Sequence, residues 1–338
     1  MIQVQLPDGS KRPFDKPVSV FEVAASIGAG LAKAALAGKV DGQLVDTSYV
    51  IDKDVQLAIV TEKDADGVEV IRHSTAHLLA YAVKELFPEA QVTIGPNVEN
   101  GFYYDIDIPE VTISTDDFKK IEEQMRKVVN QKQDFVRSEK SIDEALTWSQ
   151  ETKQPYKEEL LNDLKRAGTT IAKDLNTDEL GTITEGDSAV ENVSFYTNGE
   201  FTDLCRGPHV ENTGKTGAFK LMRVAGAYWR GKEGNPQMQR LYGVAFETKE
   251  DLHNHLQMLE EAKKRDHRKL GKELDLFTIS PLVGAGLPLF TGRGTVLREL
   301  LNDFSQQLRK NVRYEKVWTP HIAKKELYEK SLKMDEIE

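Results

Sequence analysis

The chain has 338 residues, of which 39% are hydrophobic and 30% charged, and this balance is typical of a globular protein of two or three domains. The sequence contains neither a long apolar run nor the basic and apolar segments of a secretory signal, and its single cysteine favours a reducing compartment, so we expect a cytoplasmic protein without a membrane span. The net charge of −10 argues against general affinity for nucleic acids but leaves room for a local basic patch.

Residues 1–62 predict a small α+β unit. The segment "IQVQL" alternates, "PDGS" favours a hairpin turn, and "KRPFD" can pair back as a second strand. A short helix, "SVFEVAASIG", follows with Ser19 as its capping residue, and "GKVDGQLVDTSYVI" and "VQLAIVT" supply further strands. The polar run "EKDADG" (62–67) marks the end of this unit.

Residues from about 68 to 247 predict a mixed α/β region. It opens with the helix "VIRHSTAHLLAYAVKELFP", whose apolar residues gather on one face. Strands are expected in "QVTIGPNVENGFYYDID" and a surface helix in "DDFKKIEEQMRKVVNQ". The segment "VSFYTNGEFTDLC" predicts a hairpin with Asn198 and Gly199 at its tip.

The segment "TKEDLHNHLQMLEEAKKRDHRKLGKEL", from about residue 248, predicts one charged helix that connects two domains, and the last 65 or so residues predict the beginning of a further unit. In that last part, "GRGTVLRELLNDFSQQLRK" has the spacing of an amphipathic helix. The segment "YEKVWTP" then predicts a strand that ends at Pro320.

Two compact pairs of residues could carry chemistry. His73 and His77 lie one helical turn apart, on a side nearly opposite the apolar stripe, so they either face water or face a site. Cys205 and His209 have the same spacing, but the Gly-Pro between them places them on a turn. If folding joins the pairs, three nitrogens and a sulfur would suit a tetrahedral zinc ion or a metal-free acid–base cluster. The residues alone leave these alternatives open, including no cluster at all.

A resemblance to a known family narrows them. The segments "RHSTAHLL", "IGPNVENGFYYD", "DLCRGPH", "LMRVAGAYWRG", "RLYG" and "EAKKRDHRKLGKELDLF" occur in this order. Together they resemble the N-terminal portion of a bacterial threonyl-tRNA synthetase. The resemblance implies an α+β multidomain fold: a ubiquitin-like β-grasp TGS domain (1–62), an editing domain of the threonyl/alanyl type (64–247), a linker helix (248–270) and the start of a class II antiparallel-sheet catalytic domain with its motif 1 (271–338).

The resemblance also implies a reaction. A threonine pocket rejects serine, which lacks one methyl group, by only about 1–3 kcal/mol, so a second site must hydrolyse Ser-tRNA(Thr). In that site Lys157 would position water or stabilise the oxyanion, His73 would move a proton, and Asp203 would recognise the amino group. Without the resemblance, Lys157 would be interpreted as a solvated helix lysine. The full implied set comprises the catalytic residues His73, His77, Lys157, Asp203, Cys205 and His209 and the substrate-binding residues Tyr104 and Gly95.

Cofactors and partners follow from the same resemblance. Editing is expected to need no metal, although zinc at His73, His77, Cys205 and His209 is the alternative. ATP and zinc would serve only the synthetic site of a full-length enzyme, which would be a homodimer. The tRNA acceptor end would contact basic and aromatic residues: Lys220, Arg223, Tyr228, Trp229, Arg230, Lys232 and Arg240.

The match is incomplete. The later class II motifs are missing, and the segment "LYEKSLKMDEIE" lacks the Ser-Gly-His that the family shows there. We therefore expect no aminoacylation and predict either a shortened synthetase or an editing factor that acts in trans. Two other functions remain as alternatives: a non-catalytic tRNA-binding or regulatory module, and a zinc-dependent hydrolase.

Overall fold

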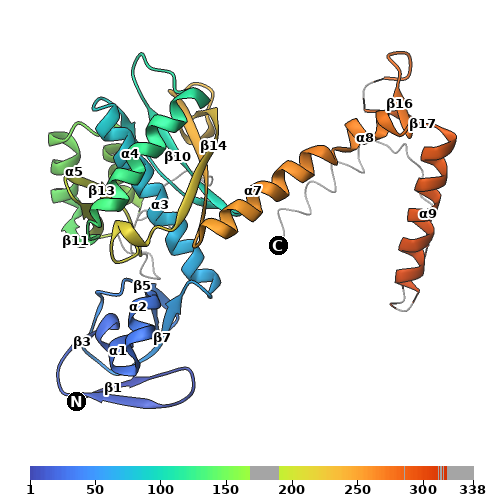
Figure 1. The fold of residues 1–338 in the computed structure, drawn as a ribbon. Coiled ribbons are helices and arrows are strands. Elements are labelled where there is room, and N and C mark those ends of the chain that lie inside the picture. Colours follow the sequence, from blue (N-terminus) through green and yellow to red (C-terminus); the bar gives the residue numbers. More distant parts are fainter. Residues whose placement is uncertain (168–189, 285, 311, 313, 315, 318–338) are drawn as a thin grey trace. The chain divides into compact units, whose positions relative to one another are not determined.

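A computed structural model describes residues 1–167, 190–284, 286–310, 312, 314, 316 and 317 (Figure 1). The chain divides into two compact units, Met1–Leu256 and Gln257–Glu338, with the boundary inside helix α7 (Lys249–Lys264). The α+β multidomain class is confirmed, whereas the domain limits expected at 62, 247 and 270 stay predictions. Among the described residues, no helix has the length and apolar character needed to cross a membrane.

The N-terminal sheet has the strand order β2-β1-β7-β4-β5, and its β1 and β7 run parallel. Its strands are β1 (Ile2–Gln5), β2 (Lys11–Phe14), β4 (Ala35–Val40), β5 (Gln43–Val45) and β7 (Val55–Thr61). A short pair, β3 (Val18–Ser19) and β6 (Val50–Ile51), and two helices, α1 (Val20–Ile27) and α2 (Ala29–Ala34), complete this part. The predicted cap is confirmed, because the Ser19 hydroxyl accepts the Glu22 N–H at 3.1 Å in a capping box.

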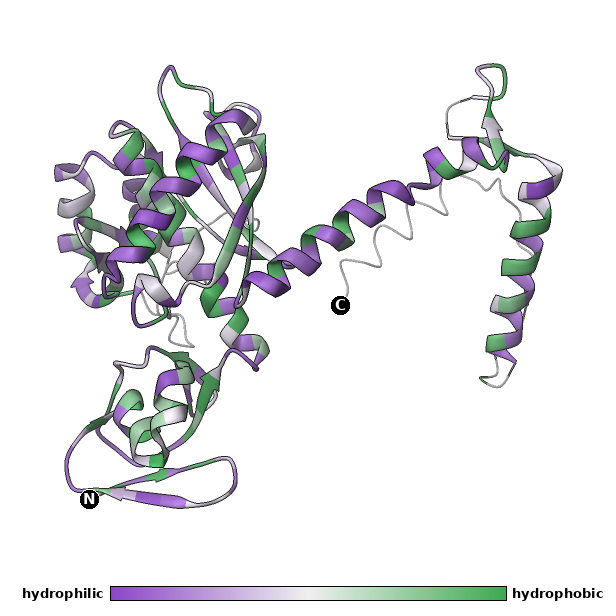
Figure 2. Ribbon diagram, viewed as in Figure 1, coloured by the Kyte–Doolittle hydropathy of each residue, from purple (hydrophilic) through white to green (hydrophobic). Residues whose placement is uncertain are grey.

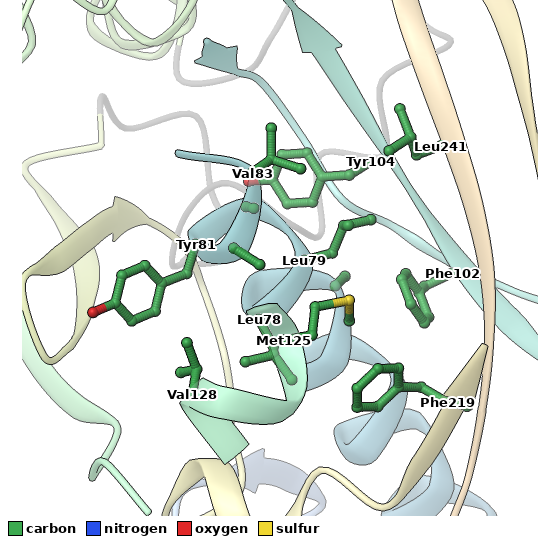
Figure 3. Close-up of a cluster of buried hydrophobic side chains, with 14 of the residues drawn as sticks. Leu78, Leu79, Tyr81, Val83, Phe102, Tyr104, Met125, Val128, Phe219 and Leu241 are labelled. Carbon is green, nitrogen blue, oxygen red and sulfur yellow. The ribbon is translucent and has the colours of Figure 1, made fainter. Parts of the chain in front are cut away.

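The central sheet has the order β14-β15-β10-β8, with β9 paired to β10. Its strands are β8 (Gln91–Val92), β9 (Asn97–Val98), β10 (Gly101–Asp107), β14 (Ala218–Tyr228) and β15 (Gln237–Phe246). Helix α3 (Ala65–Leu86) packs on this sheet and α4 (Phe118–Gln131) packs on α3. Figure 3 shows Leu78 and Leu79 of α3 among Met125 of α4 and Phe102 of β10.

The buried position of α3 corrects one expectation. Residues 74–83 of this helix are all buried, so His77 does not lie on a face that points away from a core. The polar residues Ser74 and Thr75 can enter the interior because their hydroxyls donate to the carbonyls of Val70 and Ile71, one turn earlier. The periodicity identified one apolar face. The other faces can also be buried, because the hydroxyls of Ser74 and Thr75 form hydrogen bonds within the helix.

A third, antiparallel sheet joins β11 (Val136–Ser141), β12 (Asn192–Asn198) and β13 (Phe201–Leu204), next to α5 (Ile142–Glu151) and α6 (Pro155–Ala167). The predicted hairpin is confirmed, but its turn is Gly199-Glu200 because Asn198 already pairs with Phe201. Gly199 has φ +58°, a backbone conformation that glycine adopts without strain. Short 3₁₀ turns occur at Thr115–Asp117, Thr213–Lys215 and Trp229–Gly231.

The C-terminal elements are α8 (His267–Glu273), β16 (Phe277–Ile279), β17 (Pro288–Phe290) and α9 (Gly292–Arg309). The expected single linker helix is two helices, α7 and α8, because Asp266 starts a new one by accepting the Arg268 N–H at 2.8 Å. The amphipathic helix α9 is confirmed, and Figure 2 shows its apolar residues alternating with polar ones. Most of the strand expected before Pro320 lies outside the described residues.

Candidate active site

A small cavity lies beside α3, between the central sheet and the β12–β13 hairpin. Its volume is about 30 Å³, which is room for roughly two water molecules. The lining residues are His73, His77, Ile94, Gly95, Tyr104, Asp203, Leu204 and Cys205. Six of these eight residues belong to the site predicted from the sequence; Ile94 and Leu204 were not predicted.

Three of the four residues of the predicted pairs meet around one sulfur. Cys205 Sγ lies 2.9 Å from His73 Nε2 and 3.3 Å from His209 Nε2. The imidazole rings of His73 and His209 stack with their centroids 4.5 Å apart. Cys205 and His209 are buried and His73 is half-buried, so the expected meeting of helix and turn occurs.

The hydrogen-bond network assigns the protons of this group. The Ser74 hydroxyl donates to a backbone carbonyl and accepts the Val210 N–H, so its 3.1 Å contact with Nδ1 of His209 must be donated by the imidazole. Nε2 of His209 therefore carries a lone pair, which accepts the Cys205 thiol proton. His73 in turn donates its Nε2–H to the sulfur, and its Nδ1 is left as a hydrogen-bond acceptor.

The environment keeps these imidazoles neutral. Burial, reinforced by the neighbouring histidine, lowers the pKa of His73 to about 4. Burial likewise lowers the pKa of His77 to about 4 and holds that of His209 well below 6.5. At neutral pH all three imidazoles are therefore uncharged.

Lys157 is not a solvated helix lysine. Its side chain on α6 is 1% exposed, and its Nζ lies 2.9 Å from Asp203 Oδ1. Asp203 also accepts the Tyr104 hydroxyl at 2.7 Å and the Leu204 N–H at 2.9 Å. The carboxylate thus has three donors, and a substrate ammonium would have to share or replace one of them.

Gly95 allows the Tyr104 ring to approach the backbone. A Cβ on Gly95 would lie 2.3 Å from Cδ2 of that ring, which is closer than side chains tolerate. The glycine thereby keeps the Tyr104 hydroxyl in reach of Asp203.

His77 stands apart from the sulfur-centred group. Its Nε2 lies 2.8 Å from Asn198 Oδ1, to which it donates. The ligand atoms that lie within 4.8 Å of one another come from His73, Cys205 and His209 only, so the described residues bring together three of the four expected zinc ligands. Two imidazoles and a thiolate fit zinc, which leaves a fourth position for water.

The predicted tRNA-binding residues fall into two groups. Trp229 and Arg230 are largely buried and contact α6: the indole N–H donates to Glu159 and the guanidinium lies 2.6 Å from Asp163. Arg240 forms two 2.7 Å hydrogen bonds with Asp105. The exposed residues of the set are Lys220, Arg223, Tyr228 and Lys232. Contact with tRNA stays a prediction for all of them.

A larger cleft adjoins the cavity. Its volume is about 990 Å³, and residues 43–46 and 48–50 of the N-terminal part line one side of it. Arg137, Tyr196 and Arg206–Pro208 contribute to the other wall. His73 lines both the cavity and the cleft, so a ligand in the cleft could reach the small cavity at this imidazole.

Sequence reasoning missed two residues that support His209. The Asp46 carboxylate accepts the backbone N–H of His209 at 2.9 Å and the Tyr196 hydroxyl at 2.6 Å. Burial raises the pKa of Asp46, and these hydrogen bonds offset part of that effect. No sequence motif around Asp46 indicates a role in the site. Tyr196 lies in the hairpin segment "VSFYTNGEFTDLC", which the sequence did predict.

Comparisons with known proteins show what this chain is similar to. Residues 2–61 match the TGS domain, and residues 193–242 match the threonyl and alanyl tRNA synthetase second additional domain. Over 331 residues, or 98% of this chain, the sequence is 48% identical to the threonine–tRNA ligase of Paraburkholderia phytofirmans. The identity is 49% with the threonine–tRNA ligases of Laribacter hongkongensis and Cupriavidus necator. The chain spans about half the length of these relatives, 48% of each.

Proposed function

We propose that this chain hydrolyses the ester of serine mischarged onto tRNA(Thr). The proposal starts from its similarity to the N-terminal portion of bacterial threonine–tRNA ligases. One observation carries the proposal. The neutral imidazoles of His73 and His77, a thiol and the Asp203 carboxylate line one small cavity, and the buried Lys157 ammonium reaches this site through its ion pair with that carboxylate. Ester hydrolysis needs these elements: a proton acceptor, a charge that stabilises the oxyanion and a positioned water.

The size of the cavity supports the choice of serine. A volume of about 30 Å³, enclosed by rings and aliphatic side chains, favours a small acyl group over a larger one. Such exclusion complements a synthetic pocket, which discriminates a missing methyl by only about 1–3 kcal/mol. The two sites together would then separate threonine from serine.

His73 is the proposed proton carrier. It is half-buried and borders both the cavity and the cleft, so it faces the place where the ribose and the ester would meet. Its neutral imidazole retains Nδ1 as an acceptor while its Nε2–H is held by Cys205. Lys157 supplies positive charge for the oxyanion or orients the water, and its ammonium is held by Asp203, whose carboxylate also accepts the Tyr104 hydroxyl.

The reaction as proposed uses no metal, and zinc defines the second candidate. His73, Cys205 and His209 would hold the ion, which would supply a polarised water or a Lewis acid for the carbonyl. The two candidates share one substrate and differ in their response to chelation.

Deacylation tests the proposal. The chain is incubated with Ser-tRNA(Thr) and, separately, Thr-tRNA(Thr), and ATP-dependent threonine activation serves as the negative control. We expect serine to be released well above the background rate and threonine to be retained. Release of neither amino acid would refute the proposal and favour a binding module, whereas activity that a chelator removes and zinc restores would favour the zinc hydrolase.

A further inference from the structure

We propose that Asp46, from the N-terminal β-grasp part of the chain, is a positioning residue of the hydrolytic site. It would act by fixing His209 and, through His209, the group formed by Cys205 and His73. This inference rests on the proposed function and extends the site into the N-terminal part of the chain, 163 residues from His209.

Asp46 follows β5 and is 163 residues distant from His209 in the sequence. Each of its carboxylate oxygens has one strong partner. Oδ1 accepts the His209 N–H at 2.9 Å, and Oδ2 accepts the Tyr196 hydroxyl at 2.6 Å. Hydrogen bonds to an ionised acceptor are shorter and roughly twice as strong as neutral ones, so one side chain anchors two elements of the site.

These two anchored groups enclose the His209 ring. The Tyr196 ring meets the imidazole edge-on, with centroids 4.5 Å apart. The turn before His209 packs directly on the same tyrosine, since a Cβ on Gly207 would lie 2.0 Å from the Tyr196 hydroxyl. Asp46 thus holds both the backbone of His209 and the aromatic side chain against which this turn rests.

A displacement of His209 would also displace Cys205 and His73. Its Nε2 accepts the Cys205 thiol, and its ring stacks on His73, the proposed proton carrier. A displacement of about 1 Å of catalytic groups can cost about 100-fold in rate. Loss of Asp46 should therefore slow the chemical step more than it weakens substrate binding.

Lys39 offers a matched comparison. It also joins the N-terminal part to the rest of the unit, through a 2.8 Å ion pair with Asp66 at the start of α3, but its side chain is 42% exposed. Asp54 offers a second comparison, because it accepts a backbone N–H of Gln3 at 2.8 Å within the N-terminal part itself. If general docking or general stability were the cause, these two positions would matter as much as Asp46.

The experiment compares kcat and KM for Ser-tRNA(Thr) deacylation in Asp46→Ala, Asp46→Asn, Lys39→Ala and Asp54→Ala, all at a temperature where circular dichroism shows them folded. We expect Asp46→Ala to lose about 10- to 100-fold in kcat with little change in KM. Asp46→Asn should recover part of the rate because its carbonyl oxygen can still accept the His209 N–H. The two control variants should stay within about twofold of wild type. A kcat of Asp46→Ala within that range, or an equal loss in Lys39→Ala, would overturn the inference.

A second readout is independent of activity. Long-range ¹H–¹⁵N spectra report the tautomer and surroundings of each histidine ring, with His209→Gln identifying the His209 signals. We expect Asp46→Ala to shift the His209 signals and Asp54→Ala to leave them in place. An inactive wild-type chain would reject the proposed function alone, whereas unmoved His209 signals in Asp46→Ala would reject the positioning role.

Discussion

Replacing Lys157 by methionine should reveal how strongly the site depends on its buried ion pair. The Lys157 and Asp203 side chains are 1% and 3% exposed, and their charged atoms are 2.9 Å apart. Methionine keeps the length of the side chain but leaves the carboxylate without its counter-ion. Breaking a buried pair in this way typically costs 3–5 kcal/mol. Because Tyr104 and Leu204 still donate to Asp203, we expect about 3 kcal/mol.

Urea denaturation, followed by a signal from unit Met1–Leu256, measures this loss as a change in the free energy of unfolding. The control is Lys165→Met on the same helix, whose partner Asp143 is 78% exposed, and it should change stability by less than about 1 kcal/mol. The double variant Lys157→Met/Asp203→Asn should recover part of the loss, since the uncompensated charge is gone. Additive effects of the two substitutions, or a loss at Lys157 as small as at Lys165, would refute this reasoning.

The other predictions concern the histidines and Gly95. With a pKa of about 4 in the folded state and 6.5 unfolded, His77 binds its proton mainly after unfolding, so stability falls as pH drops from 6.5 toward 4, by about 2 kcal/mol at pH 5. Denaturation at pH 7 and pH 5 checks this, and because the lowered pKa values of His73 and His209 add to the same effect, His77→Asn should reduce the difference by about 2 kcal/mol without abolishing it. Gly95→Ala should push Tyr104 away from Asp203 and lower deacylation about tenfold or more, while Gly30→Ala, which has open space, should not. His73→Ala should reduce deacylation at least 100-fold yet leave tRNA binding within about twofold; equal losses in both assays would contradict its role as proton carrier.

Much of the site was accessible to sequence reasoning because its residue types and spacings are unusual. His73 and Cys205 are 132 residues apart, yet their motifs identified both, and the structure places their side chains in contact. The burial of Lys157 was not accessible from its helix, since its partner Asp203 comes from a distant strand. Only the resemblance to a family predicted its importance.

The supporting residues could not be predicted for a related reason. Asp46 and Asn198 act through single hydrogen bonds to residues 163 and 121 positions away, and no local pattern records such pairing. The burial of His77 was missed because a helical apolar stripe reports one face, whereas Ser74 and Thr75 satisfy their own hydroxyls and permit burial on the others. Strands and helices with clear periodicity, such as β12–β13 and α9, were predicted well.

The pairing register of the β12–β13 hairpin fixes which of its side chains face the site. Tyr196 and Asp203 are paired across the strands, and Asn198 is paired with Phe201 two residues further along, so these side chains emerge from one surface of the ribbon. The opposite surface carries Phe195 and Leu204, which belong to a separate hydrophobic cluster, and Leu204 also borders the cavity at its edge. Inserting a single residue into either strand would exchange the two surfaces beyond the insertion. Polar side chains would then point into the hydrophobic cluster, and apolar side chains would point toward the cavity. The spacing of this hairpin is therefore as much a part of the chemistry as the side chains it presents.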